Sequence, residues 1–259
     1  MKYGIGYLSV VPCRREPSDT SEQTTQLLFG ETIKVYEQRR SWFRIKTSTD
    51  NYECWIDEKQ FLWISQKEYE SLVSQRPYVV SDFAQLITDI NNNEPTTLLL
   101  GSNLPNFKKG ALSIGDKKWL YEGLQRNTKS VLPKSKIKEF AMLFLNAPYQ
   151  WGGRSPFGVD CSGLVQLVYK LNGINLPRDA YQQAELGEAL SFIEEAEEGD
   201  LAFFDNSEGN ITHVGIILNN NNIIHASGRV RIDRLDHQGI FNQEINNYTH
   251  QLRLISKIY

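Results

Sequence analysis

The chain has 259 residues, about 1.7 times an ordinary domain of roughly 150, so we expect two or three domains. Apolar residues make up 40% and charged residues 23%, a balance that excludes intrinsic disorder. The net charge of −3 gives no electrostatic footprint for nucleic acid, and no run approaches the roughly 18 apolar residues of a membrane helix.

Residues 1–66 show short β-type runs separated by turn-formers. We expect strands at 5–11, 32–36, 42–47 and 54–56. Short, closely spaced strands are typical of a small barrel. The segments at 27–31, 42–45 and 52–56 resemble a bacterial SH3-like domain.

Residues 67–130 repeat this pattern more weakly. Strands are expected at 78–80, 97–101 and 118–121, and we interpret the region as a second, divergent SH3-like barrel. The polar stretch 125–133, which ends in Pro133, predicts the boundary to a third domain at 131–259.

The third domain starts with a helical pattern and continues with strands. Ile137, Phe140, Ala141 and Phe144 recur at helical spacing, with Ser135 as the expected N-cap. A buried helix at 165–171 is followed by a glycine stop. Strands are expected at 201–204, 213–218, 222–227, 230–233 and 252–258. Helices followed by a run of strands predict an α+β domain.

Cys161 lies where the glycine-containing turn 158–160 meets the start of the buried helix. A thiol at a helix N-terminus faces unpaired N–H groups, which lower its pKa. The three cysteines are widely spaced and odd in number, so we expect neither a disulfide framework nor a zinc site, and a reducing compartment fits best.

A thiolate nucleophile needs a base, and two of the four histidines lie in apolar, strand-like contexts. These are His213 and His225, whereas His237 and His250 lie in polar segments. With the motifs at 148–153, 160–163, 178–179, 199–204, 213–216 and 225–227, the region 134–259 resembles the NlpC family of papain-like cell-wall cysteine peptidases.

This resemblance implies a catalytic set and an oxyanion site. Cys161 would be the nucleophile, His213 the base and later the acid, and His225 the residue that orients the His213 ring. The backbone N–H of Cys161 and the Tyr149 hydroxyl would stabilise the oxyanion. The resemblance implies neither a metal nor another cofactor.

With the SH3-like region in front, the chain resembles the subgroup that cleaves the γ-D-glutamyl to L-diamino-acid bond of peptidoglycan stem peptides. There an acidic residue, a tyrosine and an aspartate bind the free amine of the N-terminal L-alanine. Here Glu22 or Glu16, Tyr52 and Asp179 are the candidates.

Four further positions bear on the expected cleft of this subgroup. Trp151 would line it, and Asp160 and Ser162 flank the nucleophile. Position 180 is Ala where relatives often carry a hydroxyl. One donor to the D-glutamyl carboxylate is therefore missing or is supplied by Ser162.

The resulting prediction is a papain-like α+β catalytic domain behind two small all-β SH3-like barrels. We expect a monomeric cysteine endopeptidase for released stem peptides in cell-wall peptide recycling, with either L-lysine or meso-diaminopimelate at the third position. An unconvincing signal segment favours the cytoplasm over the cell envelope. The alternatives are an amidase or acyltransferase on the same domain, or an inactive peptidoglycan-binding protein.

The spacing of the two histidines makes a geometric prediction. His213 and His225 can interact only if their strands pair so that both side chains share one sheet face. A symmetric four-residue loop at 219–222 would place them on opposite faces. We therefore predict the shifted register in which Gly215 lies opposite His225.

Overall fold

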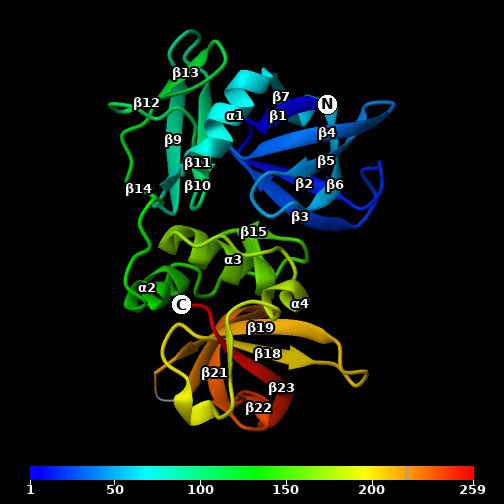
Figure 1. Ribbon diagram of the computed structural model, residues 1–259, viewed down its shortest axis with the longest axis vertical. Helices are drawn as coiled ribbons and strands as arrows, with labels where there is room; N and C mark the ends of the chain where they lie inside the picture. The colour runs from blue at the N-terminus through cyan, green and yellow to red at the C-terminus, as the bar shows by residue number, and fades with distance from the viewer. Residues whose placement is uncertain (220) are drawn as a thin grey trace. The chain divides into compact units, whose positions relative to one another are not determined.

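The computed structural model describes residues 1–219 and 221–259 and divides into two compact units (Figure 1). The first unit comprises Met1–Val131, Trp151–Pro156 and Gly173–Asn175. The second comprises Leu132–Gln150, Phe157–Asn172 and Leu176–Tyr259.

The first unit is mostly β-structure, with one α-helix. Its strands are β1 (Lys2–Gly6), β2 (Val10–Arg14), β3 (Gln23–Leu28), β4 (Thr32–Arg39), β5 (Trp42–Thr47), β6 (Glu53–Asp57), β7 (Phe61–Ile64), β8 (Tyr78–Val80), β9 (Ala84–Asp89), β10 (Pro95–Leu99), β11 (Asn103–Leu104), β12 (Ala111–Ile114), β13 (Lys117–Leu120), β14 (Gln125–Asn127) and β15 (Arg154–Ser155). Its helices are the 3₁₀ turn η1 (Glu58–Gln60) and α1 (Gln66–Ser74).

Three sheets contain strands β1 to β14, in the orders β3-β2-β6-β5-β4-β1-β7, β10-β9-β13-β12 and β11-β8-β14. The single strand predicted at 5–11 is wrong, because the chain breaks into β1, which pairs with β4 and β7, and β2, which pairs with β3 and β6. Helix α1 was not predicted, although Ser65 caps it by accepting a hydrogen bond from the Glu68 N–H.

The apolar side chains of the first unit form two clusters. One fills the seven-stranded sheet and includes Val11, Cys13 and Ile45. The other contains Ile5 from β1 and Phe29 from the turn after β3, together with residues such as Trp119 from β13. A boundary near residue 66 stays a prediction, since this second cluster draws on both sides of it.

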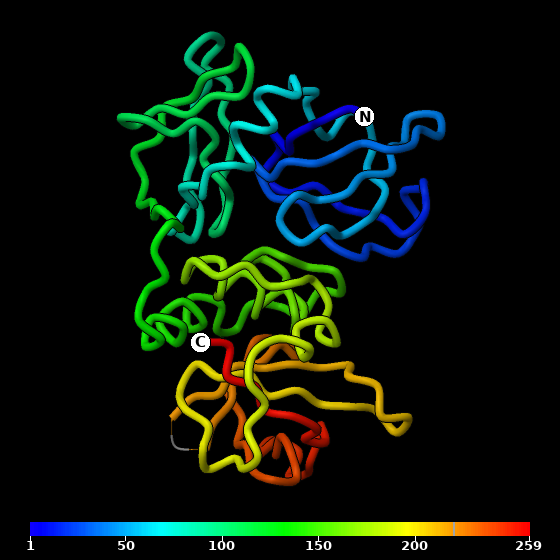
Figure 2. The backbone as a smooth tube through the Cα atoms, viewed as in Figure 1, coloured from blue at the N-terminus to red at the C-terminus, as the bar shows by residue number. Residues whose placement is uncertain are grey.

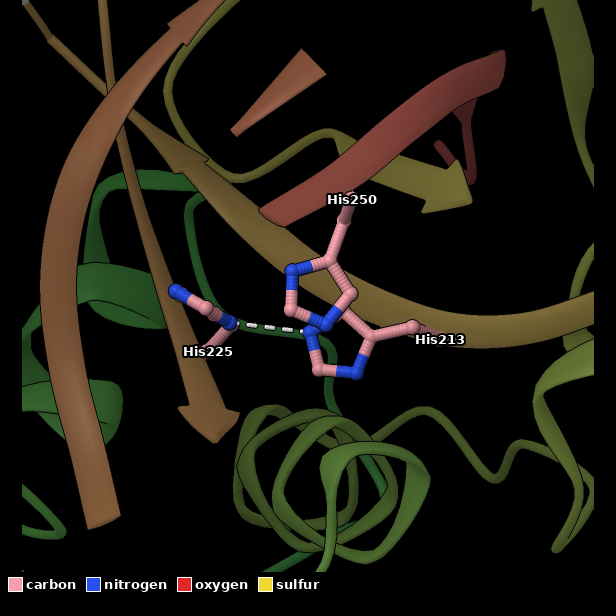
Figure 3. Close-up of side chains that lie close together, drawn as sticks. All are labelled: His213, His225 and His250. Atoms are coloured by element: carbon pink, nitrogen blue, oxygen red, sulfur yellow. Dashed lines mark hydrogen bonds between the residues drawn. The ribbon is translucent and has the colours of Figure 1, made fainter. Parts of the chain in front are cut away.

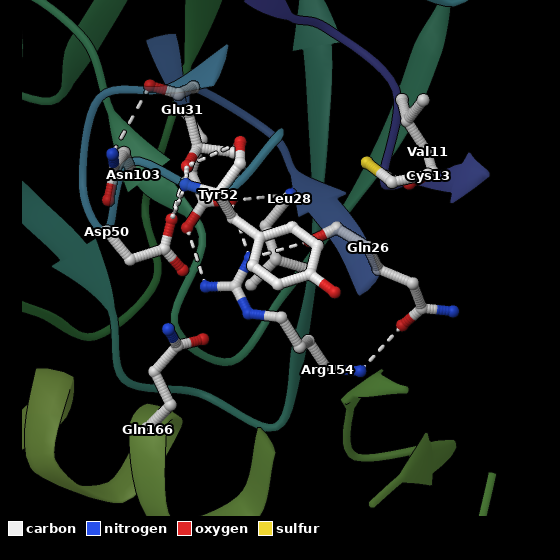
Figure 4. A network of polar contacts seen from close by, with 12 residues as sticks. Val11, Cys13, Gln26, Leu28, Glu31, Asp50, Tyr52, Asn103, Arg154 and Gln166 are labelled. Atoms are coloured by element: carbon white, nitrogen blue, oxygen red, sulfur yellow. Dashed lines mark hydrogen bonds and ion pairs between the residues drawn. The ribbon is translucent and has the colours of Figure 1, made fainter. Parts of the chain in front are cut away.

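The short segment Trp151–Pro156 belongs to the first unit and is held there by a buried ion pair (Figure 4). The Arg154 guanidinium donates to both Glu31 carboxylate oxygens, at 2.9 and 3.0 Å, and to the Gln26 carbonyl. Gly152 is required beside it: its φ is +72°, and a Cβ there would lie 2.5 Å from the Gln23 carbonyl oxygen.

The second unit combines helices with a seven-stranded sheet. Its helices are α2 (Ser135–Met142), α3 (Cys161–Asn172), α4 (Ala180–Gln183) and the 3₁₀ turn η2 (Ile193–Glu195). Its strands are β16 (Gly158–Val159), β17 (Glu188–Leu190), β18 (Leu201–Asp205), β19 (Ile211–Leu218), β20 (Asn222–Ser227), β21 (Arg229–Asp236), β22 (Gly239–Asn242) and β23 (Asn247–Lys257).

The large sheet of the second unit closes on itself. Its order is β17-β23-β18-β19-β20-β21-β22, and an additional pairing of β22 with β23 completes a barrel. Figure 2 traces the chain from the helices, in green, to the C-terminal strand, in red. The barrel core includes Phe204, Ile223 and Ile255. The predicted α+β class is confirmed.

Helix α3 is buried along its whole length and packs against β19 and β20. It ends before Gly173, whose φ of +97° confirms the predicted glycine stop. The prediction that Ser135 is an N-cap is wrong, because Ser135 is the first residue of α2. Lys134 precedes it, and its ammonium forms an ion pair with the fully buried Asp200 at 2.6 Å. Within the described residues, no helix is long and apolar enough to cross a membrane.

Candidate active site

The strands that carry the two histidines pair in the predicted register. Gly215 lies opposite His225, Ile216 opposite Ile224 and Leu218 opposite Asn222. The prediction is confirmed, and both imidazoles consequently lie on one face of the hairpin.

The two imidazole rings are in direct contact (Figure 3). Nε2 of His213 and Nδ1 of His225 are 2.9 Å apart, and the rings meet edge to face. Glycine at position 215 permits this packing, because a Cβ there would lie 2.7 Å from Cδ1 of Ile223 and 3.0 Å from the His225 Cβ. Both rings are almost fully buried.

Cys161 is the first residue of α3 and is 7% exposed. The thiol lies against the backbone of Val214, the residue after His213. Burial and the nearby Asp160 charge raise the pKa of Cys161 to about 12, and hydrogen bonds from the Val214 and Ser162 backbone N–H groups oppose them. This differs from the lowered pKa predicted for a helix start, because desolvation outweighs the helix N-terminus.

The pKa values of His213 and His225 are also shifted, in the direction that disfavours the charged imidazolium. Burial, followed by the neighbouring His225 and His250, lowers the pKa of His213 well below its ordinary value. Burial also lowers the pKa of His225, against the opposing effect of Asp233. Burial therefore acts on the Cys161 thiol and on both imidazoles in the same sense, because it disfavours the charged form of each.

The residues that flank the nucleophile are tied to one buried arginine. Arg178 donates to both carboxylate oxygens of Asp160, at 3.0 and 2.5 Å, and to the Ser162 hydroxyl at 2.8 Å. Asp160 also accepts a hydrogen bond from the Gly163 N–H at 2.7 Å, which caps α3. These contacts fix the turn before Cys161 and engage the groups predicted to meet substrate.

Tyr149 lies beside the nucleophile. Its backbone forms an isolated bridge with Val159, two residues before Cys161. Burial, followed by the proximity of Cys161 and Asp160, raises the pKa of Tyr149 to about 12. The hydroxyl therefore keeps its proton and can act as a hydrogen-bond donor at neutral pH.

Asp179 and Ala180 lie at the start of α4. Asp179 is the N-cap, and its backbone N–H donates to the Gln182 side chain at 3.2 Å. Ala180 is buried. Position 180 thus offers no side-chain donor.

The other predicted binding residues lie in the first unit. Glu22 accepts a hydrogen bond from the Trp151 indole at 2.7 Å and pairs with Arg15 at 3.0 Å. The Tyr52 backbone N–H donates to Thr47 and Asp50, and its side chain packs against the apolar cluster of the first unit that includes Val11, Cys13 and Ile45. Trp151 therefore contacts Glu22. Glu16 is exposed, and its backbone N–H donates to the Ser21 hydroxyl.

Comparison with known families agrees with this geometry. A model described as the NlpC/P60 family matches residues 146–249, and one described as the bacterial dipeptidyl-peptidase SH3 domain matches residues 13–61. The chain carries an NlpC/P60 domain and a bacterial dipeptidyl-peptidase SH3 domain.

Curated relatives are similar to this chain over most of its length. The gamma-D-glutamyl-L-lysine dipeptidyl-peptidase of Bacillus cereus is 28% identical, over 81% of this chain and 68% of its own length. Dipeptidyl-peptidase 6 of Lysinibacillus sphaericus is 26% identical over 86% of this chain and 88% of its own length. A crystal structure of an NlpC/P60 family protein from Bacillus cereus has the same fold, with a TM-score of 0.83 and 19% identity over 99% of both chains.

A third histidine, which sequence reasoning left aside, also lies at the site. His250, from β23, stacks on His213 with ring centroids 4.1 Å apart and an interplanar angle of 25° (Figure 3). Its Nδ1 lies 2.8 Å from the Thr249 hydroxyl. Its polar neighbours in the sequence concealed this position, because only closure of the barrel brings β23 to the site.

The three histidines offer ring nitrogens within 4.8 Å of one another, which raises the question of a metal ion. A metal centre needs lone pairs that converge on one point about 2.1 Å from each nitrogen. Here two of the nitrogens already face each other, and the stacked His250 ring directs its lone pairs alongside those of His213. The arrangement fits proton transfer better than metal binding.

His250 is expected to support the reaction through its ring face. Burial, followed by His225, lowers the pKa of His250 to about 4, so a neutral ring covers His213 near neutral pH. An aromatic face stabilises a cation by about 0.5–2 kcal/mol. We expect His250→Ala to lower kcat/KM about 10-fold and His250→Phe to lower it less than about 3-fold, measured by peptide hydrolysis. Equal losses in the two variants would remove stacking as the cause.

Proposed function

We propose that the chain is a cysteine dipeptidyl-peptidase for peptidoglycan stem peptides. It hydrolyses the bond between γ-D-glutamate and the L-diamino acid of peptides that begin with a free L-alanine amine. The observation that carries this proposal is the buried Cys161 thiol at the start of α3, placed against the backbone of Val214 next to the hydrogen-bonded His213 and His225.

The reaction begins with a proton transfer inside the site. Because Nε2 of His213 is engaged by His225, Nδ1 is the nitrogen left to take the Cys161 proton. The sulfur attacks the γ-carbonyl carbon of D-glutamate, and the carbonyl oxygen becomes an oxyanion. The Cys161 backbone N–H and the protonated Tyr149 hydroxyl donate to that oxyanion.

The second half of the reaction releases the two products. The His213 imidazolium gives its proton to the leaving amine of the diamino acid, and an acyl-enzyme thioester remains. His213 then takes a proton from water, whose oxygen attacks the thioester carbon. The proton returns to the sulfur, and the L-alanyl-D-glutamate dipeptide leaves.

Recognition of the free amine rests on the resemblance and on the names of the relatives. A dipeptidyl-peptidase must recognise the N-terminus of its substrate, and Glu22, Tyr52 and Asp179 are the proposed amine-binding groups. Between the two acidic candidates we favour Glu22, because its carboxylate meets Trp151, a second predicted binding residue.

A free-amine requirement confines the enzyme to released peptides. In intact peptidoglycan the alanine amine is blocked by its link to muramic acid. This supports a place in cell-wall peptide recycling. The compartment and the monomeric state remain predictions, which cell fractionation and sedimentation would test.

The test is mass spectrometry of products from L-Ala-γ-D-Glu-L-Lys and its diaminopimelate analogue. N-acetylation of the alanine removes the positive charge, and we expect kcat/KM to fall by about 100-fold, equivalent to about 2.7 kcal/mol. Glu22→Gln should erase most of this discrimination, while the matched Glu16→Gln should keep it. Equal rates on free and acetylated peptides would refute amine recognition, and no cleavage of any peptide would refute the proposed function.

A further inference from the structure

The second of the two paired histidines, His225, is hydrogen-bonded to an acidic residue that sequence reasoning did not single out. Nε2 of His225 lies 3.0 Å from Oδ2 of Asp233 on β21. Both side chains are at least 95% buried. His213, His225 and Asp233 therefore form a continuous polar chain that leads away from Cys161 through two neighbouring strands, β20 and β21.

Arg231 holds the Asp233 carboxylate in its ionised form. Its guanidinium donates from Nε to Oδ2 at 2.7 Å and from Nη2 to Oδ1 at 2.9 Å. Burial pushes the pKa of Asp233 upward, but the hydrogen bonds from His225 and Arg231 outweigh it and hold that pKa below its usual value. The carboxylate is thus an acceptor without a proton to give.

Because Asp233 can only accept, it fixes the position of each proton in the hydrogen-bonded series Asp233–His225–His213. Asp233 requires the proton of neutral His225 to be on Nε2, which leaves Nδ1 bare. A bare Nδ1 requires His213 to donate from its own Nε2. The Nδ1 of His213 is then bare as well, and only in that tautomer can it accept a proton from a thiol.

We propose that Asp233 is a positioning residue that fixes the tautomers of His225 and, through it, of His213. The inference rests on the proposed cysteine peptidase function for its catalytic consequence. Asp233 does not take up the proton. It remains an anion, hydrogen-bonded to His225, when His213 becomes an imidazolium.

The charged and titratable groups around the relay, which comprises His213, His225 and Asp233, come from four strands and from Cys161 on α3. His213 lies on β19, His225 on β20, Arg231 and Asp233 on β21, and His250 on β23. Outside this group, Glu244 accepts from Arg231 at 2.9 Å and is 56% exposed. Asp233 is therefore the anion in direct contact with a relay histidine, and Glu244 acts on the relay through Arg231.

Two substitutions of Asp233 separate its two effects. Asp233→Asn keeps an oxygen that can accept from His225 but removes the charge, whereas Asp233→Leu has a similar shape and removes both. The matched control is Arg231→Gln, which disturbs the same strand but leaves a carboxylate on His225. ¹⁵N NMR of the histidine rings in the full chain reports each tautomer without any substrate.

We expect wild type, Asp233→Asn and Arg231→Gln to show a bare Nδ1 on both His213 and His225, and Asp233→Leu to show mixed tautomers. In Asp233→Leu, kcat should fall about 100-fold with KM within about 2-fold, because only the fraction of the protein with a bare Nδ1 on His213 can accept the thiol proton. Arg231→Gln should stay within about 5-fold of wild type. If Asp233→Leu does not fold, Asp233→Leu with Arg231→Met supplies an apolar pair instead.

A proton on Nδ1 of His225 in wild type, or unchanged tautomers in Asp233→Leu, would overturn the proposal. Equal losses of kcat in Asp233→Leu and Arg231→Gln would assign the effect to strand structure instead. The proposed function fails separately, because a wild-type protein that cleaves no stem peptide would still give the NMR result.

Discussion

Replacing Cys161 by alanine is expected to abolish hydrolysis of the stem peptide, with kcat/KM at least about 10⁴-fold below wild type. The reason is chemical, because no other group at the start of α3 can form the thioester. Packing changes little, since only a small sulfur is lost where the chain begins a helix that is buried throughout. Product formation followed by mass spectrometry gives the rate, and urea unfolding gives the stability.

The first unit supplies the matched control. Cys13 is also buried and free, and lies in the cluster that fills the seven-stranded sheet. Cys13→Ala should retain near-wild-type turnover while losing some stability, the opposite pattern to Cys161→Ala. Residual activity in Cys161→Ala above the uncatalysed rate of the peptide would exclude the thioester mechanism.

The register of the histidine hairpin could be predicted because one constraint decides it. Side chains alternate between faces along a strand, so His213 and His225 can meet only when the paired residue numbers have an even sum. Glycine at position 215 then allows the close approach. Local arguments of this kind also located the start of α3, where Asp160 accepts from the Gly163 N–H.

Contacts between segments that lie far apart in the sequence could not be predicted from it. Arg154 and Glu31 are 123 residues apart, and each alone is typical of an exposed loop, so their buried pairing had no local signal. His250 and Asp233 were missed for the same reason, since each reaches the site only when β20, β21 and β23 join one closed sheet. The Cys161 pKa was misjudged because burial, which outweighs the helix start, is a property of the whole fold.

Breaking the ion pair between Arg178 and Asp160 is expected to have the largest effect on stability. Arg178→Met leaves the Asp160 carboxylate in the interior with the Gly163 N–H but without its guanidinium. Removing one partner of a buried pair costs about 3–5 kcal/mol of unfolding free energy. Activity should fall too, because Asp160 raises and Arg178 lowers the pKa of Cys161, and losing Arg178 makes the thiol harder to deprotonate.

The double variant Arg178→Met with Asp160→Asn separates charge from packing. It removes the buried carboxylate as well, so it should recover most of the unfolding free energy lost in Arg178→Met, as measured by urea denaturation. The two side chains share a hydrogen-bond network with Ser162, so their effects should be strongly non-additive. Additive losses in the single and double variants would mean that the turn before Cys161 is held by other contacts and that the ion pair contributes little to placing the nucleophile.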